Sequence, residues 1–132
     1  MKNHFYTPVN WFRSLRIAIH GLFLIIKNER NFRIQLGVAF VVGIAGLVMG
    51  FDHSEWIATG FFVTLVLISE AFNSCIEAVC DCISQEYRST IKYAKDVSAG
   101  AVLLSSIASV IGGLIIIYPH VLPVIRQFLG IK

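Results

Sequence analysis

The residues best suited to chemistry in this sequence form a polar face on one helical segment. Four polar residues recur at intervals of three, four and four positions within an otherwise apolar stretch: Glu70, Asn73, Glu77 and Asp81. On an α-helix this spacing places the four side chains along one side. A carboxylate at membrane depth costs several kcal/mol unless it is paired, protonated or bound to a cation. Three acids on one face therefore predict positive charge opposite them.

That positive charge could come from a neighbouring helix or from a metal ion. Apart from Arg33 and Lys95 at their ends, the apolar segments contain no Lys or Arg, which makes an ion pair with a neighbouring helix the weaker interpretation. Glu77 and Asp81 lie one helical turn apart and repel each other unless a divalent cation or a proton relieves the repulsion. Mg²⁺ takes one or two carboxylates and leaves its other positions to water and phosphate oxygens. The pattern favours a Mg²⁺ site, with structural ion pairing as the alternative.

Two smaller charged groups flank the apolar segments. Lys95 and Asp96 precede the small residues VSAGA, so that Lys95 could bring positive charge to a phosphate. A Lys-Asp pair at a helix start is also ordinary capping and topology charge, and this second interpretation stays open. Glu29 lies within KNERNFR. By itself it is a solvated acid at a helix end, and it becomes a metal ligand only if packing brings it near Glu77.

The composition indicates a protein whose solvent is lipid. The chain has 132 residues, of which 56% are hydrophobic and 14% charged, and its mean hydropathy is +0.73. These values exclude an ordinary soluble domain of this size. The net charge of +3 is small and scattered, whereas nucleic-acid binding needs a clustered basic face, so no nucleic-acid partner is expected. We expect the apolar segments themselves to insert the chain, without a removable signal peptide.

The expected fold class is an all-α membrane protein with one domain, residues 1–132. Apolar residues recur every three or four positions among basic ones near the N-terminus, which predicts an amphipathic interfacial helix at about 10–28. Long apolar runs predict three transmembrane helices, at about 32–51, 56–84 and 95–118. Pro119 and Pro123 are expected to end the last of them.

The distribution of basic residues predicts the orientation in the membrane. Six Lys and Arg residues lie before residue 34, three lie in the loop 85–96, and none lies in the turn at Asp52. Cytoplasmic segments carry the excess of Lys and Arg. The N-terminus and the loop 85–96 are therefore expected in the cytoplasm.

Two motifs resemble those of the prokaryotic diacylglycerol kinase family. EAFNSCIEAVCD at 70–81 matches E-x-x-N-(S/T)-(A/C)-I-E-x-x-x-D, and AKDVSAGAV at 94–102 matches A-K-D-x-(A/S)-A-(G/A)-A-V. The two motifs at this separation are highly specific, and the resemblance runs from about residue 10 to residue 113. It implies a homotrimer in the bacterial cytoplasmic (inner) membrane, with active sites shared between subunits. It also implies phosphate transfer from ATP to a membrane lipid alcohol, with Mg²⁺ as cofactor.

The same resemblance implies a role for each motif residue. Glu70 would be the general base for the lipid hydroxyl, and Glu29 and Glu77 would hold the metal. The residues implied in binding the lipid substrate are Glu70, Asn73 and Ala99. The residues implied in nucleotide binding are Glu29, Glu77, Glu86, Tyr87, Arg88, Lys95 and Asp96. This sequence departs from the family at Arg88, where a His is common.

The choice of lipid rests on one segment. ERNFRIQ at 29–35 looks more like the undecaprenol-using members of the family than the diacylglycerol-using ones, so undecaprenol is the favoured substrate. A different class of function is a small proton-coupled transporter, in which Glu70 and Glu77 exchange protons with a cationic substrate. That alternative leaves the charged pair at Lys95 and the amphipathic helix unexplained. A non-catalytic membrane subunit is a third alternative.

Overall fold

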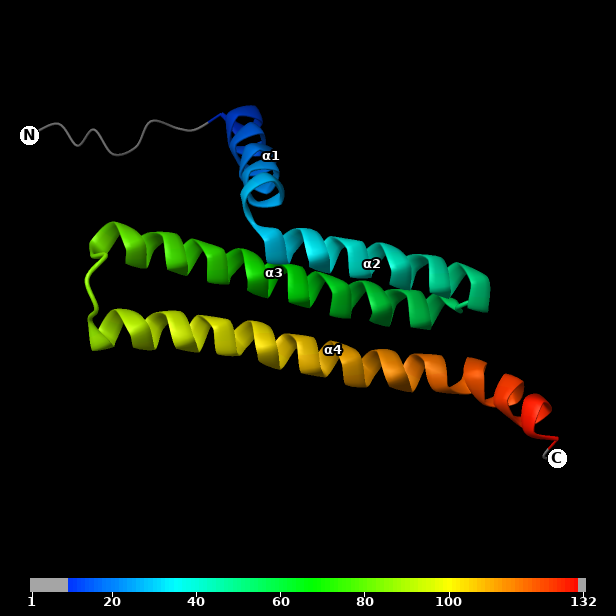
Figure 1. Ribbon diagram of the computed structural model, residues 1–132. Helices are drawn as coiled ribbons and strands as arrows, with labels where there is room; N and C mark the ends of the chain where they lie inside the picture. Colours follow the sequence, from blue (N-terminus) through cyan, green and yellow to red (C-terminus); the bar gives the residue numbers. More distant parts are fainter. Residues whose placement is uncertain (1–9, 131–132) are drawn as a thin grey trace, which may run out of the picture.

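A computed structural model describes residues 10–130 of the chain, apart from the side chain of Val124. It contains four α-helices (Figure 1): α1 (Trp11–Asn28), α2 (Arg30–Met49), α3 (His53–Ile83) and α4 (Ser89–Leu129). Helices α2, α3 and α4 lie side by side with alternating direction, and α1 projects away from them. The prediction of an all-α fold is confirmed.

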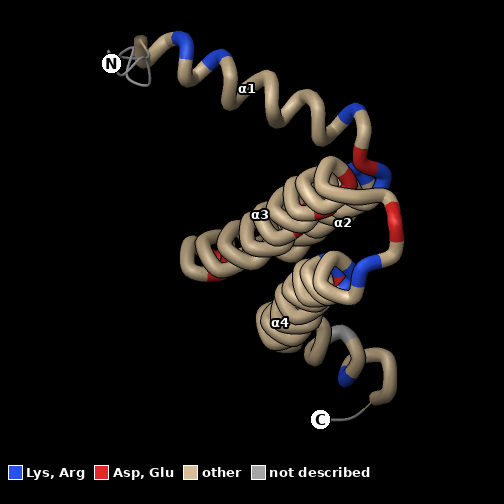
Figure 2. The backbone as a smooth tube through the Cα atoms, turned by 90° about the vertical axis from the view of Figure 1, so that its left-hand side faces the viewer, with Lys and Arg blue, Asp and Glu red and all other residues tan. Residues whose placement is uncertain are grey.

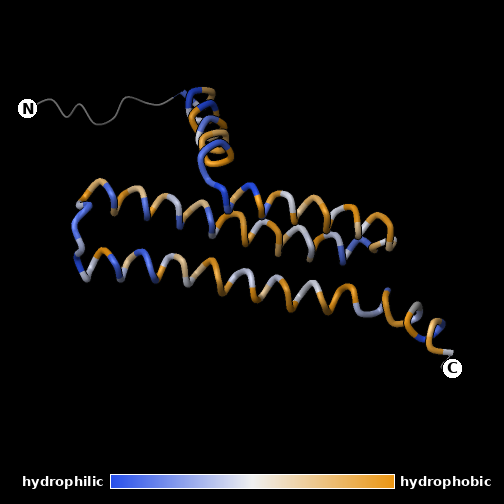
Figure 3. Tube along the Cα trace, viewed as in Figure 1, coloured by the Kyte–Doolittle hydropathy of each residue, from blue (hydrophilic) through white to orange (hydrophobic). Residues whose placement is uncertain are grey.

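Three of the described helices are long and apolar enough to cross a membrane: α2, α3 and the part of α4 within Ser89–Pro123. Figure 3 shows apolar residues along most of their length. At 1.5 Å per residue, the 20 residues of α2 cover about 30 Å and the 31 residues of α3 about 46 Å. The hydrocarbon core of a bilayer is about 30 Å thick. The predicted number of spans is confirmed, and α3 is long enough to carry its polar end beyond the hydrocarbon.

A tight turn and a capping box connect α2 to α3. Gly50 ends α2 at φ 71°, a left-handed conformation that glycine adopts without a Cβ clash. The Asp52 side chain accepts a hydrogen bond from the Glu55 backbone N–H, and the Glu55 carboxylate accepts one from the Asp52 backbone N–H, both at 2.8 Å. From α4, His120 Nε2 lies 2.9 Å from Glu55 Oε1. These contacts fix the relative heights of the three spans at this end.

Helices α3 and α4 pack closely where a glycine faces an aromatic ring. A Cβ on Gly112 would lie 2.2 Å from the Phe62 ring, so a larger residue would push the helices apart. Beside this contact, Ser109 Oγ donates to the Phe62 carbonyl oxygen at 3.2 Å. In the described part of the chain, the buried hydrophobic residues are Phe32, Phe51 and Cys80. Small residues and polar contacts therefore hold the spans together, as in helices that pack in lipid.

Helix α4 does not end at its prolines, and this part of the sequence interpretation was wrong. We expected Pro119 and Pro123 to stop the third spanning helix, but α4 continues through both to Leu129. A proline removes one helical hydrogen bond and crowds the preceding turn, and membrane helices tolerate it because local adjustments and neighbouring groups satisfy the freed carbonyls. Figure 1 shows the last turns of α4 curving away from α2 and α3.

A single non-helical residue joins α1 to α2. Glu29 has φ −95° and ψ 115°, an extended conformation between two helices. Arg33 Nη1 donates to the carbonyl oxygens of Ile26 and Lys27 at 3.1 and 2.8 Å, and so caps the end of α1 from the first turns of α2. Helix α1 has no buried residue, and Figure 2 shows it to one side of the other helices. Its placement at the membrane surface stays a prediction.

Candidate active site

The polar face of α3 runs from the interior of the helix bundle to its surface. Glu70 is 3% exposed and Asn73 is 8% exposed. Further along the same helix, Glu77 is half-buried and Asp81 is exposed. The face therefore connects a buried acid to the end of α3 that leads into the loop before α4.

Glu70 is held by an amide from α2. Gln35 Nε2 donates to Glu70 Oε2 at 3.0 Å. Within residues 10–130, no Lys, Arg or His forms an ion pair with Glu70. The second polar atom of the amide, Gln35 Oε1, is buried and has no hydrogen-bond partner among the described residues. A buried carboxylate with a neutral donor and no paired cation is a suitable acceptor for a proton.

Asn73 links the next acid of the face to α4. Its Nδ2 donates to Glu77 Oε1 at 3.0 Å, and its Oδ1 accepts from Ser98 Oγ at 2.6 Å. Ser98 is 6% exposed, and its Oγ also lies 2.9 Å from the Lys95 carbonyl oxygen, so its single hydroxyl proton is shared between two acceptors. Both ends of the amide are used, which determines its orientation. Asn73 thereby orients the Glu77 carboxylate from the buried part of the bundle.

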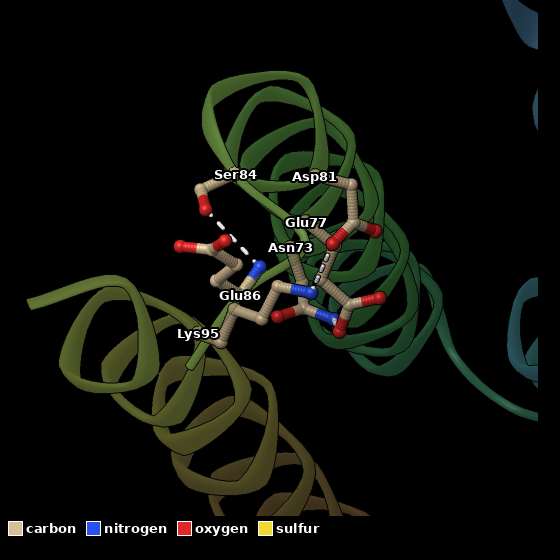
Figure 4. A network of polar contacts seen from close by, with 6 residues as sticks. All are labelled: Asn73, Glu77, Asp81, Ser84, Glu86 and Lys95. Atoms are coloured by element: carbon tan, nitrogen blue, oxygen red, sulfur yellow. Dashed lines mark hydrogen bonds and ion pairs between the residues drawn. The ribbon is translucent and has the colours of Figure 1, made fainter. Parts of the chain in front are cut away.

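At the end of the face, an acid of α3 pairs with a lysine of α4. Lys95 Nζ lies 2.5 Å from Asp81 Oδ1 (Figure 4), and Lys92 pairs with Asp96 one turn apart on α4. The ion pair with a neighbouring helix, which the sequence left as the weaker alternative, is therefore present at Asp81. The lysine comes from the first turns of α4, just outside the apolar run. For Glu77, by contrast, the described residues supply no ion pair.

A hollow of about 470 Å³ opens beside the pair of Lys95 and Asp81. It lies between the end of α3, the loop before α4 and the first turns of α4, where Glu86 N–H donates to Ser84 Oγ at 3.1 Å (Figure 4). Its lining includes five of the residues predicted to bind the nucleotide: Glu86, Tyr87, Arg88, Lys95 and Asp96. The structure therefore brings these five together around one space.

Glu29 and Ala99 lie outside this hollow. Glu29 is half-buried at the junction of α1 and α2. In residues 10–130 no group of three or more His, Cys, Asp or Glu side chains is arranged to hold a metal ion. Ala99 is exposed on α4, directly after the buried Ser98. The pairing of Glu29 with Glu77 around a metal, and the contact of Ala99 with the lipid, stay predictions.

Two contact residues, Gln35 and Ser98, were not predicted. Gln35 is a polar residue within the apolar run that starts at Phe32, and a lone amide in a spanning segment commonly bonds to another helix. Ser98 follows Lys95 by three residues and so lies on the same side of α4. Both signals are present in the sequence, but the partner of each residue depends on how the helices are aligned.

An apolar groove of about 430 Å³ follows α2, α3 and α4. Its lining on α2 extends from Ile34 to Val42, about 12 Å at the helical rise, and Phe51 lines it from the turn after α2. Its walls are mostly apolar, with Val38 from α2, Val66 from α3 and Val110 from α4. Gln35 also lines it, so the groove reaches the residue that holds Glu70.

Similarity to known proteins agrees with the two motifs. The sequence profile of the family described as prokaryotic diacylglycerol kinase matches residues 16–117. The chain belongs to the prokaryotic diacylglycerol kinase family. A diacylglycerol kinase of Synechocystis sp. is 39% identical over 127 residues, 92% of this chain and 70% of that protein. An undecaprenol kinase of Bacillus subtilis is 30% identical over 118 residues, 89% of this chain and 96% of that protein. A diacylglycerol kinase of Escherichia coli is 37% identical over 94 residues, 70% of this chain and 76% of that protein.

Membership in this family confirms three of the expectations drawn from the sequence. The chain is an enzyme, a lipid kinase, and its three apolar helices make it a membrane protein. Membership in a kinase family implies that ATP is the phosphate donor. The transporter alternative is not favoured, because the relatives named above are kinases.

Proposed function

We propose that this lipid kinase transfers the γ-phosphoryl group of ATP to the hydroxyl of a membrane lipid alcohol, with Glu70 as general base. The observation that carries the proposal is the setting of Glu70. It is 3% exposed, it is hydrogen-bonded to the neutral amide of Gln35, and the same glutamine lines the apolar groove. A lipid chain in the groove would present its hydroxyl to this carboxylate away from bulk water. Such a setting suits proton abstraction from an alcohol.

In the proposed reaction, the Glu70 carboxylate accepts the proton of the lipid hydroxyl while the hydroxyl oxygen bonds to the γ-phosphorus. The bond from the γ-phosphorus to the oxygen that bridges to the β-phosphate breaks, and ADP leaves with the electron pair of that bond. Glu70 then returns its proton to water. Phosphoryl transfer depends on positioning and charge neutralisation. The hydrogen bonds that hold Glu70 and Asn73 in place therefore contribute to catalysis in the proposed reaction.

Glu29 and Glu77 are the proposed ligands of Mg²⁺. Helices α2 and α3 are antiparallel neighbours and touch at Gln35 and Glu70. Glu29 precedes Gln35 by six residues, about 9 Å of helix, and Glu77 follows Glu70 by seven, about 10.5 Å. The two acids therefore lie at similar heights. They offer the oxygen ligands that Mg²⁺ takes together with phosphate oxygens, and the bound metal would neutralise charge on the ATP phosphates.

The nucleotide is proposed to occupy the hollow between the α3–α4 loop and the start of α4. Lys95 and Arg88 supply positive charge for the phosphates, and Arg88 adds a bidentate donor where the family commonly has His. Tyr87 is 81% exposed and offers its ring to the adenine. Glu86 and Asp96 supply acceptors for the remaining donors of the nucleotide. The sequence contains no glycine-rich phosphate-binding loop of the P-loop type.

The proposed lipid is undecaprenol in preference to diacylglycerol. The support for this choice is the segment 29–35, which resembles the undecaprenol-using members of the family. Gln35, the last residue of that segment, bonds to Glu70 and lines the groove, so the segment reaches the place where the hydroxyl would lie. Asn73 and Ala99 are proposed to contact the same substrate.

The proposed assembly is a homotrimer in the bacterial cytoplasmic (inner) membrane with its N-terminus in the cytoplasm. Helix α1, with large apolar residues exposed and basic residues among them, would lie in the membrane interface. Figure 2 shows charged residues gathered near the α1–α2 junction and the α3–α4 loop, as expected for the cytoplasmic side. A trimer would enclose the exposed ends of the polar face with a neighbouring subunit.

The test is a phosphorylation assay with purified protein in detergent micelles. Transfer of radiolabelled γ-phosphate from Mg·ATP to undecaprenol and to diacylglycerol is measured side by side. Glu70→Gln should abolish labelling, whereas Ser69→Ala should keep it, because the Ser69 hydroxyl bonds to the Leu65 carbonyl of its own helix at 2.8 Å. Labelled lipid from Glu70→Gln at the wild-type rate would refute the role of this residue. No labelled lipid from folded wild-type protein would refute the proposed function.

A further inference from the structure

In the observed arrangement the Lys95 ammonium is paired with Asp81, so a phosphate that approaches this lysine also meets the negative charge of Asp81. The two side chains are 2.5 Å apart, and Figure 4 shows the lysine reaching from α4 across to α3. The Lys95 side chain is 35% exposed and that of Asp81 is 59% exposed. Ion pairs this accessible to water contribute little to stability. The lysine can therefore exchange one anionic partner for another at small cost.

The charges around the hollow balance before any nucleotide enters. Its lining carries three acids, Asp81, Glu86 and Asp96, and three basic residues, Arg88, Lys92 and Lys95, so the formal charges sum to zero. Both lysines are already paired, Lys95 with Asp81 and Lys92 with Asp96. An anionic nucleotide that enters the hollow therefore finds neither lysine free unless one of them changes partner.

We propose that Asp81 is a positioning residue that holds the Lys95 ammonium beside the hollow and yields it to the phosphates when nucleotide binds. This inference rests on the proposed function, because it takes the incoming anion to be the nucleotide. Asp81 competes with the phosphates for one lysine, and it recaptures that lysine when ADP leaves. Asp81 thus weakens nucleotide binding and favours product release.

Asp81 fits this role better than the acid one turn before it. Glu77 is half-buried and its Oε1 accepts from Asn73, which is itself held by Ser98. Asp81 has Lys95 as its side-chain hydrogen-bond partner among the described residues, and it lies at the exposed end of the polar face. Releasing Lys95 therefore leaves Asp81 facing water, which can solvate the free carboxylate.

The experiment measures binding of Mg·ADP and of the Mg²⁺ complex of a non-hydrolysable ATP analogue to the full chain in micelles by calorimetry. Asp81→Asn should bind both nucleotides about 2- to 5-fold more tightly, the size of an exposed ion pair, and the gain should shrink as salt rises. Lys95→Gln should bind more weakly. The double variant should match Lys95→Gln, because Asp81 acts through that lysine.

Asp52→Asn is the matched control. It removes the same charge at the opposite end of α3, where asparagine still caps a helix, and it should leave nucleotide binding unchanged. Asp81→Ser repeats the test with a smaller side chain, so the result does not depend on one variant folding. In steady-state assays the Asp81 variants should show a lower KM for Mg·ATP and stronger inhibition by Mg·ADP, a combination that a merely structural role would not produce.

Three outcomes would overturn the proposal. Unchanged or weaker nucleotide binding by folded Asp81→Asn would show that Asp81 does not compete for the lysine. Equal tightening in the Lys95→Gln background would show that Asp81 acts directly on the nucleotide and not through Lys95. Wild-type protein that binds no nucleotide would refute the proposed function as well, whereas the first two outcomes would leave that function intact.

Discussion

Replacing Gln35 with methionine isolates the contribution of one hydrogen bond to the proposed general base. Methionine keeps the length and apolar stem of the side chain but removes the Nε2 donor that lies 3.0 Å from Glu70 Oε2. A hydrogen bond to a charged group contributes about 1.5 to 3 kcal/mol. If that contact orients Glu70 in the transition state, its loss should lower kcat/KM for the lipid roughly 10- to 150-fold. KM for Mg·ATP should stay near its wild-type value, because Gln35 does not line the nucleotide hollow.

Thr59→Val is the matched control for the Gln35 experiment. Thr59 lines the same apolar groove and is buried, so its replacement also exchanges a polar atom for an apolar one near the proposed lipid. Activity close to wild type is expected, because Thr59 makes no hydrogen bond to Glu70 in the described structure. A folded Gln35→Met enzyme with full lipid kinase activity, or an equal loss in Thr59→Val, would refute the reasoning.

Three further changes test other parts of the structure. Gly112→Leu should destabilise the α3–α4 packing by about 1 to 3 kcal/mol, because a Cβ there would lie 2.2 Å from the Phe62 ring. Unfolding in SDS measures this loss of stability. Gly113→Leu is the control, because the space around its Cβ position is open. Glu77→Gln should raise the Mg²⁺ concentration needed for half-maximal activity, and an unchanged Mg²⁺ titration would argue against a metal ligand. His120→Ala should lower the Tm through loss of its 2.9 Å contact with the α3 capping box, while KM for Mg·ATP stays the same.

The helices were predictable because their signals are local. Lipid requires the backbone to satisfy its own hydrogen bonds, and so long apolar runs become helices wherever they occur. The structure confirms the three predicted spans, which are α2, α3 and α4. The end of α4 was not predictable by the same rule, because the effect of Pro119 and Pro123 depends on what surrounds the freed carbonyls. In a soluble helix of average length the same prolines would be reliable stops.

The candidate site was predictable on one helix but not between helices. The spacing of Glu70, Asn73 and Glu77 determines that they share a face of α3, whatever packs against it. Their partners on α2 and α4 depend on the heights at which the helices meet. Those heights follow from contacts such as Gly112 against Phe62 and the capping box at Asp52, which a single sequence does not reveal. For this reason Gln35, Ser98 and the pairing of Lys95 escaped the sequence interpretation.

The length of the polar face suggests why one membrane acid would not suffice for this chemistry. From Glu70 to Asp81 there are eleven residues, about 16.5 Å along α3. If α1 lies in the membrane interface as proposed, Glu29 marks the level of the polar boundary, and the proposed base lies about 9 Å deeper, at the height of Gln35. A lipid hydroxyl can reach that depth, but a phosphate needs polar partners along the way. Asn73 lies about one helical turn from Glu70 towards that boundary, and Glu77, the proposed ligand of Mg²⁺, lies about two turns from Glu70. Under the proposed function, these two residues allow the γ-phosphate to meet a buried alcohol while the rest of the nucleotide stays in water beside Lys95.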